Sequence, residues 1–469
     1  MTQRQGSTIM RRVVTKGWRV ALSHPYRSKG DFRLTLLVRT MLYALRGGFL
    51  VRPLVIALLL GIAGMLFSEF EEAYPALDVW VPTMLFPSHS DPQIAQVILS
   101  SIATSIMTVV SIVFAILLMT LTLASVQFSP RILVSFVRDR WTQWTLGIFL
   151  GTFSYCMAAL PAARALPVPF SPVATVAGAM LLALLCVGWL IFFIHHGSQA
   201  ISVNHIVDRI AGETEQVINE LMPHPRTRLY RSEERAPRDV AYIPIACPCS
   251  GYIRVVDTRG LLTVAKAARL RVQVMRRVGH FVPAGVPLLT VSRADRLDAE
   301  TRAALVATFD IGPTRTLQQD VEFGVLQIAD IALKAISPAV NDPSTAITCL
   351  DQLGRIMIRW ISRDTPASGL FDPPHVLRVA MPWIDLDGLL DTAFEQIRHY
   401  AESDLPVSLR LLRTLQDIAV TTSDPVIRGQ LLLRADRVLE GCRGRLDEAA
   451  TARLRDRLAA LHVMVEGAE

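Results

Sequence analysis

The sequence lacks the short motifs that mark common catalytic sites. It contains no phosphate-binding loop of the G-x-x-x-x-G-K-[ST] type, no H-E-x-x-H and no G-x-S-x-G. Carboxylates occur in pairs, but no cleft around them can be argued from the sequence. We therefore expect no enzymatic activity, no catalytic residue and no cofactor.

Cysteine is scarce and shows no pairing pattern. Cys247 and Cys249 form a C-x-C pair without a second pair or a histidine at ligand spacing, so we expect no metal site. We expect no disulfide framework either, because two cysteines fall in hydrophobic segments and four on the side that we assign to the cytoplasm. The six are Cys156, Cys186, Cys247, Cys249, Cys349 and Cys442.

Acidic residues are nearly absent from residues 1–48, where ten Lys and Arg side chains accompany only Asp31. Apolar residues alternate with these positive charges, a pattern typical of amphipathic helices on a membrane surface. Much of the formal charge of +7 therefore suits anionic lipid headgroups, and we expect no nucleic-acid partner.

Charged residues are also scarce in four long hydrophobic segments: the one at about residues 49–70 has only Arg52 and Glu69, near its ends, and those at about 94–127, 144–162 and 173–194 have none. Each can cross a hydrocarbon layer of about 30 Å. The segment between the first two spans is acidic, whereas residues 1–48 and the loop with Arg131, Arg138 and Arg140 are basic. Since positive loops stay inside, the sequence predicts a four-span domain over residues 49–197 with both termini in the cytoplasm.

The second span carries hydroxyl groups at helical spacing. Two interpretations remain open: close packing between helices, or a polar face toward water in a pore. The candidate pore-lining residues are Ser101, Thr104, Ser105, Thr108 and Ser111.

The rest of the chain predicts a cytoplasmic α+β region, so the whole is a mainly α membrane protein. Residues 198–240 indicate a helical linker, and 241–293 a small β-module of short strands broken by glycine. Gly279 and Gly285 in this module match the turn glycines of the biotinyl/lipoyl-like β-sandwich, which the segment resembles. Lys266 is expected on a short helix, not as an acylated carrier lysine. Residues 294–469 predict mostly amphipathic helices. Asp342 followed by Pro343 predicts a helix start, and further helices are expected from residues 385, 406, 425 and 446, with an isolated strand at 376–380.

One stretch is dense in specific polar groups. On a predicted helix over 316–336, Asp320 shares a face with Gln327, and Arg315 lies one turn ahead, where it can pair with Asp320. Such a network either ties helices and subunits together or binds an ion or small ligand; both alternatives stay open. Asn341 and Asp342 lie in the loop before the next helix, from which they can fold back onto this face. The candidate residues are Arg315, Asp320, Gln327, Asp330, Asn341 and Asp342.

Two motifs in this stretch, R-T-x-x-Q-D-x-x-F-G from Arg315 and S-P-A-x-N-D-P-x-T-A from Ser337, follow four spans and a Q-F-S-P-R segment from Gln127. In this order the parts resemble a bacterial family of predicted membrane proteins, domain of unknown function 2254. The resemblance implies location and architecture but no activity.

Two hypotheses follow for a protein of the bacterial inner membrane. The first is a homo-oligomeric channel for ions or small solutes, lined by the second span and gated or assembled by the cytoplasmic domain. The second is a non-conducting, membrane-anchored sensor or scaffold that recruits a cytoplasmic partner.

Overall fold

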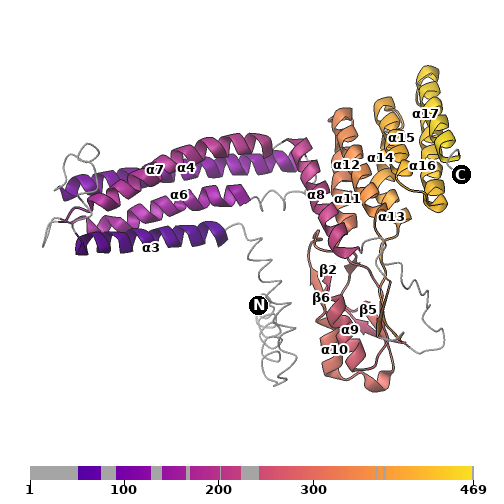
Figure 1. The fold of residues 1–469 in the computed structure, drawn as a ribbon, viewed down its shortest axis with the longest axis horizontal. Helices are drawn as coiled ribbons and strands as arrows, with labels where there is room; N and C mark the ends of the chain where they lie inside the picture. Colours follow the sequence, from indigo (N-terminus) through magenta and orange to yellow (C-terminus); the bar gives the residue numbers. More distant parts are fainter. Residues whose placement is uncertain are drawn as a thin grey trace, which may run out of the picture.

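The computed structural model describes residues 51–74, 91–127, 140–164, 170–200, 202–222, 242–364, 368–372 and 376–466. The molecule is elongated, with a helical bundle at one end and a mixed α/β part at the other (Figure 1). The predicted amphipathic region 1–48 and the loop positions Arg131 and Arg138 lie outside the described residues.

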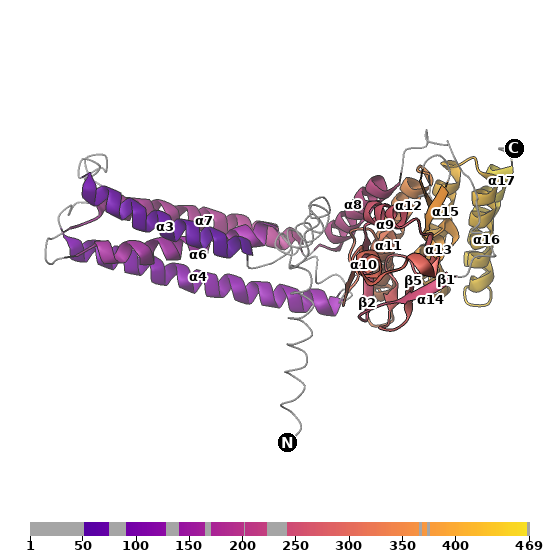
Figure 2. The same cartoon turned by 90° about the horizontal axis from the view of Figure 1, so that it is seen from below.

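Four helices of the bundle are long and apolar enough to cross a membrane. They are α3 (Val51–Ala73), α4 (Pro92–Gln127), α6 (Arg140–Ala159) and α7 (Val173–Ala200). They lie side by side in Figures 1 and 2, and α6 is the most enclosed: 50% of its span is buried, against 17% in each of the others. The prediction of four membrane-type helices in a mainly helical protein is confirmed.

Glycine allows α3 and α6 to approach closely. Gly147 and Gly151, one helical turn apart on α6, lie against Ile56 and Leu60 of α3, where even a methyl group would collide. Small residues at this spacing are typical of membrane helix contacts. The G-x-x-x-G match in the third span is thus a contact between two helices of the same chain.

A buried carboxylate links α3 to α7 at the end of the bundle that lies away from the α/β part (Figure 1). Glu71 of α3 accepts hydrogen bonds from the backbone N–H groups of Ala174 and Thr175, both at 2.7 Å, and from Thr175 Oγ1 at 2.6 Å. These donors belong to the first turn of α7, where the helix dipole favours a negative charge. Arg164 pairs with Glu72 beside it.

Helix α8 (Val203–Leu221) connects the bundle to the second part of the molecule. Its apolar side, including Ile210 and Ile218, is buried against α11 (Val321–Ala335) and α12 (Pro343–Ile361). Arg355 of α12 pairs with Asp208 at 2.8 Å and Glu215 at 2.6 Å. The first half of the predicted linker 198–240 is therefore a helix built into the helical core.

The β-part contains two sheets, in strand order β1-β5-β3-β8-β7 and β4-β2-β6. The β3–β8 pair is parallel and the other pairs are antiparallel. Helices α9 (Thr258–Ala267) and α10 (Ala299–Val306) accompany them, and α9 includes Lys266, as predicted. The strands are β1 (Tyr242–Ala246), β2 (Gly251–Val256), β3 (Val272–Val274), β4 (Phe281–Val282), β5 (Pro287–Ser292), β6 (Phe309–Gly312), β7 (Gly369–Asp372) and β8 (Val376–Ala380).

Three of these strands, β6, β7 and β8, come from beyond the predicted module 241–293. The isolated strand predicted at 376–380 finds its partners in β3 and β7. Sequence periodicity is local, so it cannot assign a late strand to an early sheet.

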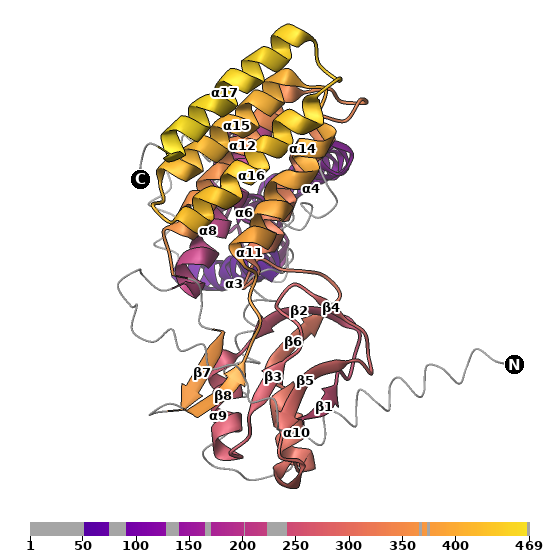
Figure 3. The same cartoon turned by 90° about the vertical axis from the view of Figure 1, so that its right-hand side faces the viewer.

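The remaining helices pack on α8, α11 and α12 to form one apolar core. Figure 3 shows this helical part on one side and the sheets on the other. Aspartates cap α11, α12, α15 and α16, and Asp342 followed by Pro343 starts α12 as predicted. The helices after α12 are α13 (Leu386–Leu390), the π-helical η5 (Asp391–Glu395), α14 (Gln396–Tyr400), α15 (Leu405–Val420), α16 (Pro425–Cys442) and α17 (Glu448–Glu466).

Candidate functional site

The hydroxyl groups of α4 point away from the bundle. We define the hydroxyl face as Ser101, Thr104, Ser105, Thr108 and Ser111, all of which are exposed. The opposite side of α4 is buried by the other helices through Ala95, Leu99, Ala103, Ile106 and Val113. The hydroxyl face therefore does not serve packing within the described part of this chain.

Several hydroxyls of this face donate hydrogen bonds to carbonyls one turn back. Thr104 donates to Ser100 O at 2.8 Å, Thr108 to Thr104 O at 3.1 Å, and Ser111 to Met107 O at 2.9 Å. This bonding satisfies the hydroxyl proton inside a membrane, while the oxygen keeps acceptor capacity. The face can therefore meet a second protein surface or water.

The outward faces of α3 and α7 are different in character. Their exposed side chains are large and apolar, with Leu54 and Leu58 on α3 and Leu181, Leu184 and Ile191 on α7 each more than 60% exposed. Such surfaces suit lipid tails. The hydroxyl face of α4 is thus a polar surface beside lipid-type surfaces.

A second candidate site lies where the β-part meets the helical part. We define the joint cluster as Arg277, His280, Arg315, Asp320, Glu322 and Thr392. Arg277 and His280 precede β4, Arg315 and Asp320 lie between β6 and α11, Glu322 is in the first turn of α11, and Thr392 is in η5. The cluster therefore joins three separate segments of the chain.

Arg315 is held by two carboxylates. Its Nε and one Nη atom donate to Asp320 at 2.7 and 2.8 Å, and the same Nη donates to Glu322 at 2.9 Å. Asp320 is buried and also caps α11 by accepting from the N–H of Phe323 at 3.1 Å. The helix therefore begins at Val321, later than the predicted start at residue 316, because Asp320 serves as its cap.

Arg277 brings the β-part into the same cluster. It donates to Glu322 at 2.9 Å and to His280 Nε2 at 2.8 Å, while Thr392 Oγ1 donates to Glu322 at 3.3 Å. Gly279 has a φ of +87°, and a Cβ there would collide with the Asp320 carboxylate and the Arg315 guanidinium. The turn glycine thus lets the backbone approach the ion pairs.

Charges within the joint cluster shift the pKa values of its members. Burial alone would raise the pKa of Glu322, but the hydrogen bonds and charges of Arg277 and Arg315 lower it below its ordinary value. Burial, followed by the nearby charge of Arg277, lowers the pKa of His280. The imidazole is therefore neutral near pH 7, as its acceptor role toward Arg277 requires.

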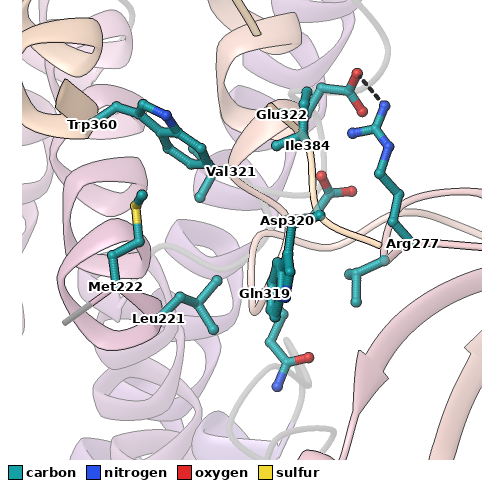
Figure 4. A pocket seen from close by; sticks show the side chains of 11 residues that line it. Leu221, Met222, Arg277, Gln319, Asp320, Val321, Glu322, Trp360 and Ile384 are labelled. Carbon is teal, nitrogen blue, oxygen red and sulfur yellow. Dashed lines mark hydrogen bonds and ion pairs between the residues drawn. The ribbon is translucent and has the colours of Figure 1, made fainter. Parts of the chain in front are cut away.

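A cavity of about 30 Å³ adjoins the cluster (Figure 4). Leu221 and Met222 at the end of α8 line it, with Trp360 of α12 and the acidic side chains of Asp320 and Glu322. A space of this size holds about one water molecule. At the joint cluster itself, the geometry therefore favours a structural joint over a pocket for an organic ligand.

The structure separates the six residues of the predicted network. Arg315 and Asp320 meet, whereas Asn341 and Asp342 lie at the other end of α11, where the N–H of Asp342 bonds to Ala335 O. Asp342 caps α12 through Thr345, Asn341 is exposed at a φ of +51°, Gln327 is buried in α11 and Asp330 is half-buried. The predicted folding back of the 341–342 loop onto Asp320 does not occur.

Sequence reasoning missed four members of the joint cluster: Arg277, His280, Glu322 and Thr392. Glu322 carried a signal for the helix start alone, because the helix dipole favours an acid in the first turn. Arg277 and Thr392 lie 45 and 70 residues from Glu322, and no local pattern links them.

We expect Glu322→Gln to lower the free energy of unfolding by about 1.5–3 kcal/mol at pH 7, the usual range for hydrogen bonds to a charged group. Because the folded pKa of Glu322 lies below its unfolded value, its stabilisation is present above about pH 4.3 and is lost as the pH falls through the folded pKa. The melting temperature of the wild-type protein in detergent should therefore decline more steeply from pH 5 to pH 3 than that of the variant. Glu300→Gln, at an exposed position on α10, is the control and should follow the wild-type profile; equal slopes for Glu322→Gln would contradict the assignment.

Comparison with known proteins identifies the family. The model of the family described as "Predicted membrane protein (DUF2254)" matches residues 46–417. This chain belongs to the DUF2254 family. It is 32% identical over 344 residues to an uncharacterized protein of Mycobacterium tuberculosis strain H37Rv and to one of Mycobacterium bovis. The match covers 71% of this chain and 65% of each relative, so the chain spans less than two thirds of their length. No solved structure matches this DUF2254 chain.

Proposed function

We propose that this DUF2254 protein is a homo-oligomeric channel for ions or small solutes in the bacterial inner membrane, with both termini in the cytoplasm. It conducts and does not catalyse. The hydroxyl faces of α4 from neighbouring copies line the shared path, and the α/β part assembles the oligomer and gates it.

The outward direction of the hydroxyl face carries this proposal. A membrane helix whose hydroxyls served only its own bundle would turn them inward, yet all five face away from α3, α6 and α7. Lipid offers hydroxyl oxygens no hydrogen-bond donors, whereas water in a pore does. A ring of copies with α4 innermost places these oxygens on water and the apolar faces of α3 and α7 on lipid.

The joint cluster supports a mechanical role for the α/β part. Leu221, the last residue of α8, and Met222, which caps the helix, line the cavity beside Asp320 and Glu322. In this proposal, Arg277 transmits a displacement of the β-part to Glu322 of α11. Helix α8, which packs on α11, then transmits it to α7, the fourth span. We propose that the β-part is a biotinyl/lipoyl-like module, since both of its turn glycines, Gly279 and Gly285, have positive φ.

Recordings from purified protein in planar bilayers test the proposal. We expect discrete currents, which Thr108→Leu and Ser111→Leu each reduce by about tenfold, because a leucine replaces a water-bonding oxygen with apolar volume. Thr120→Leu is the matched control: it removes a hydroxyl from the same helix at a half-buried position off the hydroxyl face and should leave conductance unchanged.

Silent bilayers with an intact oligomer would overturn the channel. In that case the self-satisfied hydroxyls of α4 would form a dry contact between copies. The alternative function, a membrane-anchored sensor or scaffold that recruits a cytoplasmic partner, would then replace it. A stoichiometric partner that co-purifies from native membranes, and that is lost with an Asp320→Ala variant still purifying as an intact oligomer, would identify that function.

A further inference from the structure

The outward face of α4 changes character along its length. Up to Ser111 it carries mainly hydroxyls, with Met107 38% exposed beside them, and then it carries Ile112, Ile116 and Met119, which are 54%, 42% and 73% exposed. Phe114 and Leu118 are exposed on the same stretch of α4. Thr122, one turn beyond, is again an exposed hydroxyl residue. A band of large apolar side chains is thus bounded by hydroxyls on both sides.

These apolar residues continue the line of the hydroxyl face. Ser105, Ile112 and Met119 are seven residues apart, so they lie nearly above one another on a helix, and Ile116 lies one turn before Met119. Seven residues rise about 10 Å, so the band from Ile112 to Met119 extends about 10 Å along the helix axis. On the opposite side of α4, Val113 is fully buried at this level.

The position of this band across the membrane follows from the length of α4 and from its contact with residue 163. Ala95 lies near the outer end, where Gln96 bonds to Ala163 O, and Met119 follows 24 residues later. Twenty-four helical residues rise about 36 Å, against about 30 Å for the hydrocarbon core. Met119 therefore lies at the inner boundary of the membrane.

Aromatic residues mark the same boundary. Trp141, Trp189 and Phe192 pack together, with ring centroids 5.2 to 6.4 Å apart. Aromatic side chains gather at membrane interfaces. Val113 of α4 packs in one cluster with Leu146 and Phe193, which lie next to these aromatic residues in α6 and α7. The apolar band is therefore at the inner mouth of the bundle, on the side where α8 and the α/β part follow α7.

We propose that Ile112, Ile116 and Met119 from each copy form the gate of the channel, a hydrophobic constriction that closes by excluding water. This inference rests on the proposed function. When the copies of α4 draw together, the apolar band dewets and no ion passes, while the hydroxyl-lined stretch outside it stays hydrated. Small rotations or separations of α4 wet the band, and the α/β part on the inner side supplies them.

Accessibility to a thiol reagent tests the gate. In a Cys249→Ser background, which removes the one exposed cysteine of the six, single cysteines replace Thr104, Thr108 and Thr122. A membrane-impermeant methanethiosulfonate added from outside should label Thr104→Cys and Thr108→Cys in the closed channel. Thr122→Cys should react only with reagent added from inside, because the apolar band separates it from the outer solution.

The outcomes distinguish the gate from the channel itself. Labelling of all three cysteines from outside in the closed channel would overturn the gate and leave the pore. Labelling of none of them from either side, with an intact oligomer, would place the face in lipid or in a dry contact and overturn both.

Recordings give an independent readout of the same gate. Met119→Ser should raise the resting open probability by about tenfold or more, because a polar ring holds water in the constriction. Ile191→Ser on the lipid-facing side of α7, close to the same aromatic boundary, is the matched control and should leave it unchanged. If Met119→Ser left the open probability unchanged while Thr108→Leu reduced conductance, the proposed gate would be wrong and the proposed channel would be supported.

Discussion

Asp320→Ala is expected to lower the free energy of unfolding by about 3–5 kcal/mol, the cost of removing one partner from a buried ion pair. The substitution leaves the Arg315 guanidinium, whose side chain is 16% exposed, without its bidentate partner. It also removes the N-cap of α11, worth about 1 kcal/mol. Thermal or denaturant unfolding of the full chain in detergent measures the loss.

Asp424→Ala is the matched control for this prediction. Asp424 caps α16 by accepting from the N–H of Val426 at 2.9 Å, but it is exposed. It should cost only the cap, about 0.5–2 kcal/mol. Adding Arg315→Ala to Asp320→Ala should cost little more, since the two residues act as one unit. Equal losses for Asp320→Ala and Asp424→Ala would show that the ion pair contributes nothing.

Gly64→Ala is expected to disrupt the membrane bundle. A Cβ at Gly64 would lie 2.6 Å from the carbonyl oxygen and 3.1 Å from the Cα of Tyr155, so α3 must move away from α6. Overpacking of this kind costs about 1–3 kcal/mol, and more where backbone atoms are involved. We expect a lower melting temperature and less monodisperse protein in size-exclusion chromatography.

Gly188→Ala tests whether the effect is specific to that contact. Among the described residues, no atom lies within 4 Å of the position that a methyl group at Gly188 on α7 would take, so an alanine fits without collision. Alanine also favours helix by up to about 1 kcal/mol over glycine. Gly188→Ala should therefore be neutral or stabilising; the same loss at both positions would mean that close approach of α3 and α6 is unimportant.

Local patterns predicted the spans and the helices that follow them. The long apolar segments became α3, α4, α6 and α7, because length and apolarity decide whether a helix can cross lipid. Helices after Pro343 begin within two residues of their predicted starts, because aspartate caps and prolines mark those positions in the sequence itself.

Long-range contacts decided the sites. The Arg315–Asp320 pair was within reach of sequence reasoning because five residues separate its members. The other contacts of the cluster were not. Arg277 belongs to the β-part and Thr392 to η5, and no local sequence pattern relates either residue to Glu322. For the same reason the predicted approach of Asn341 and Asp342 to this cluster was wrong.

The sequence by itself determined that this DUF2254 protein has four membrane-type helices, a hydroxyl face on the second of them, and a following region of sheets and helices. Only the tertiary structure decided that this face turns away from its own bundle, that strands from residues 309–380 complete the early sheets, and that Arg277, Arg315 and Glu322 meet. The physical reason is that helix formation and membrane partition depend on neighbouring residues, whereas the direction of a face depends on which other surfaces bury the rest of the helix.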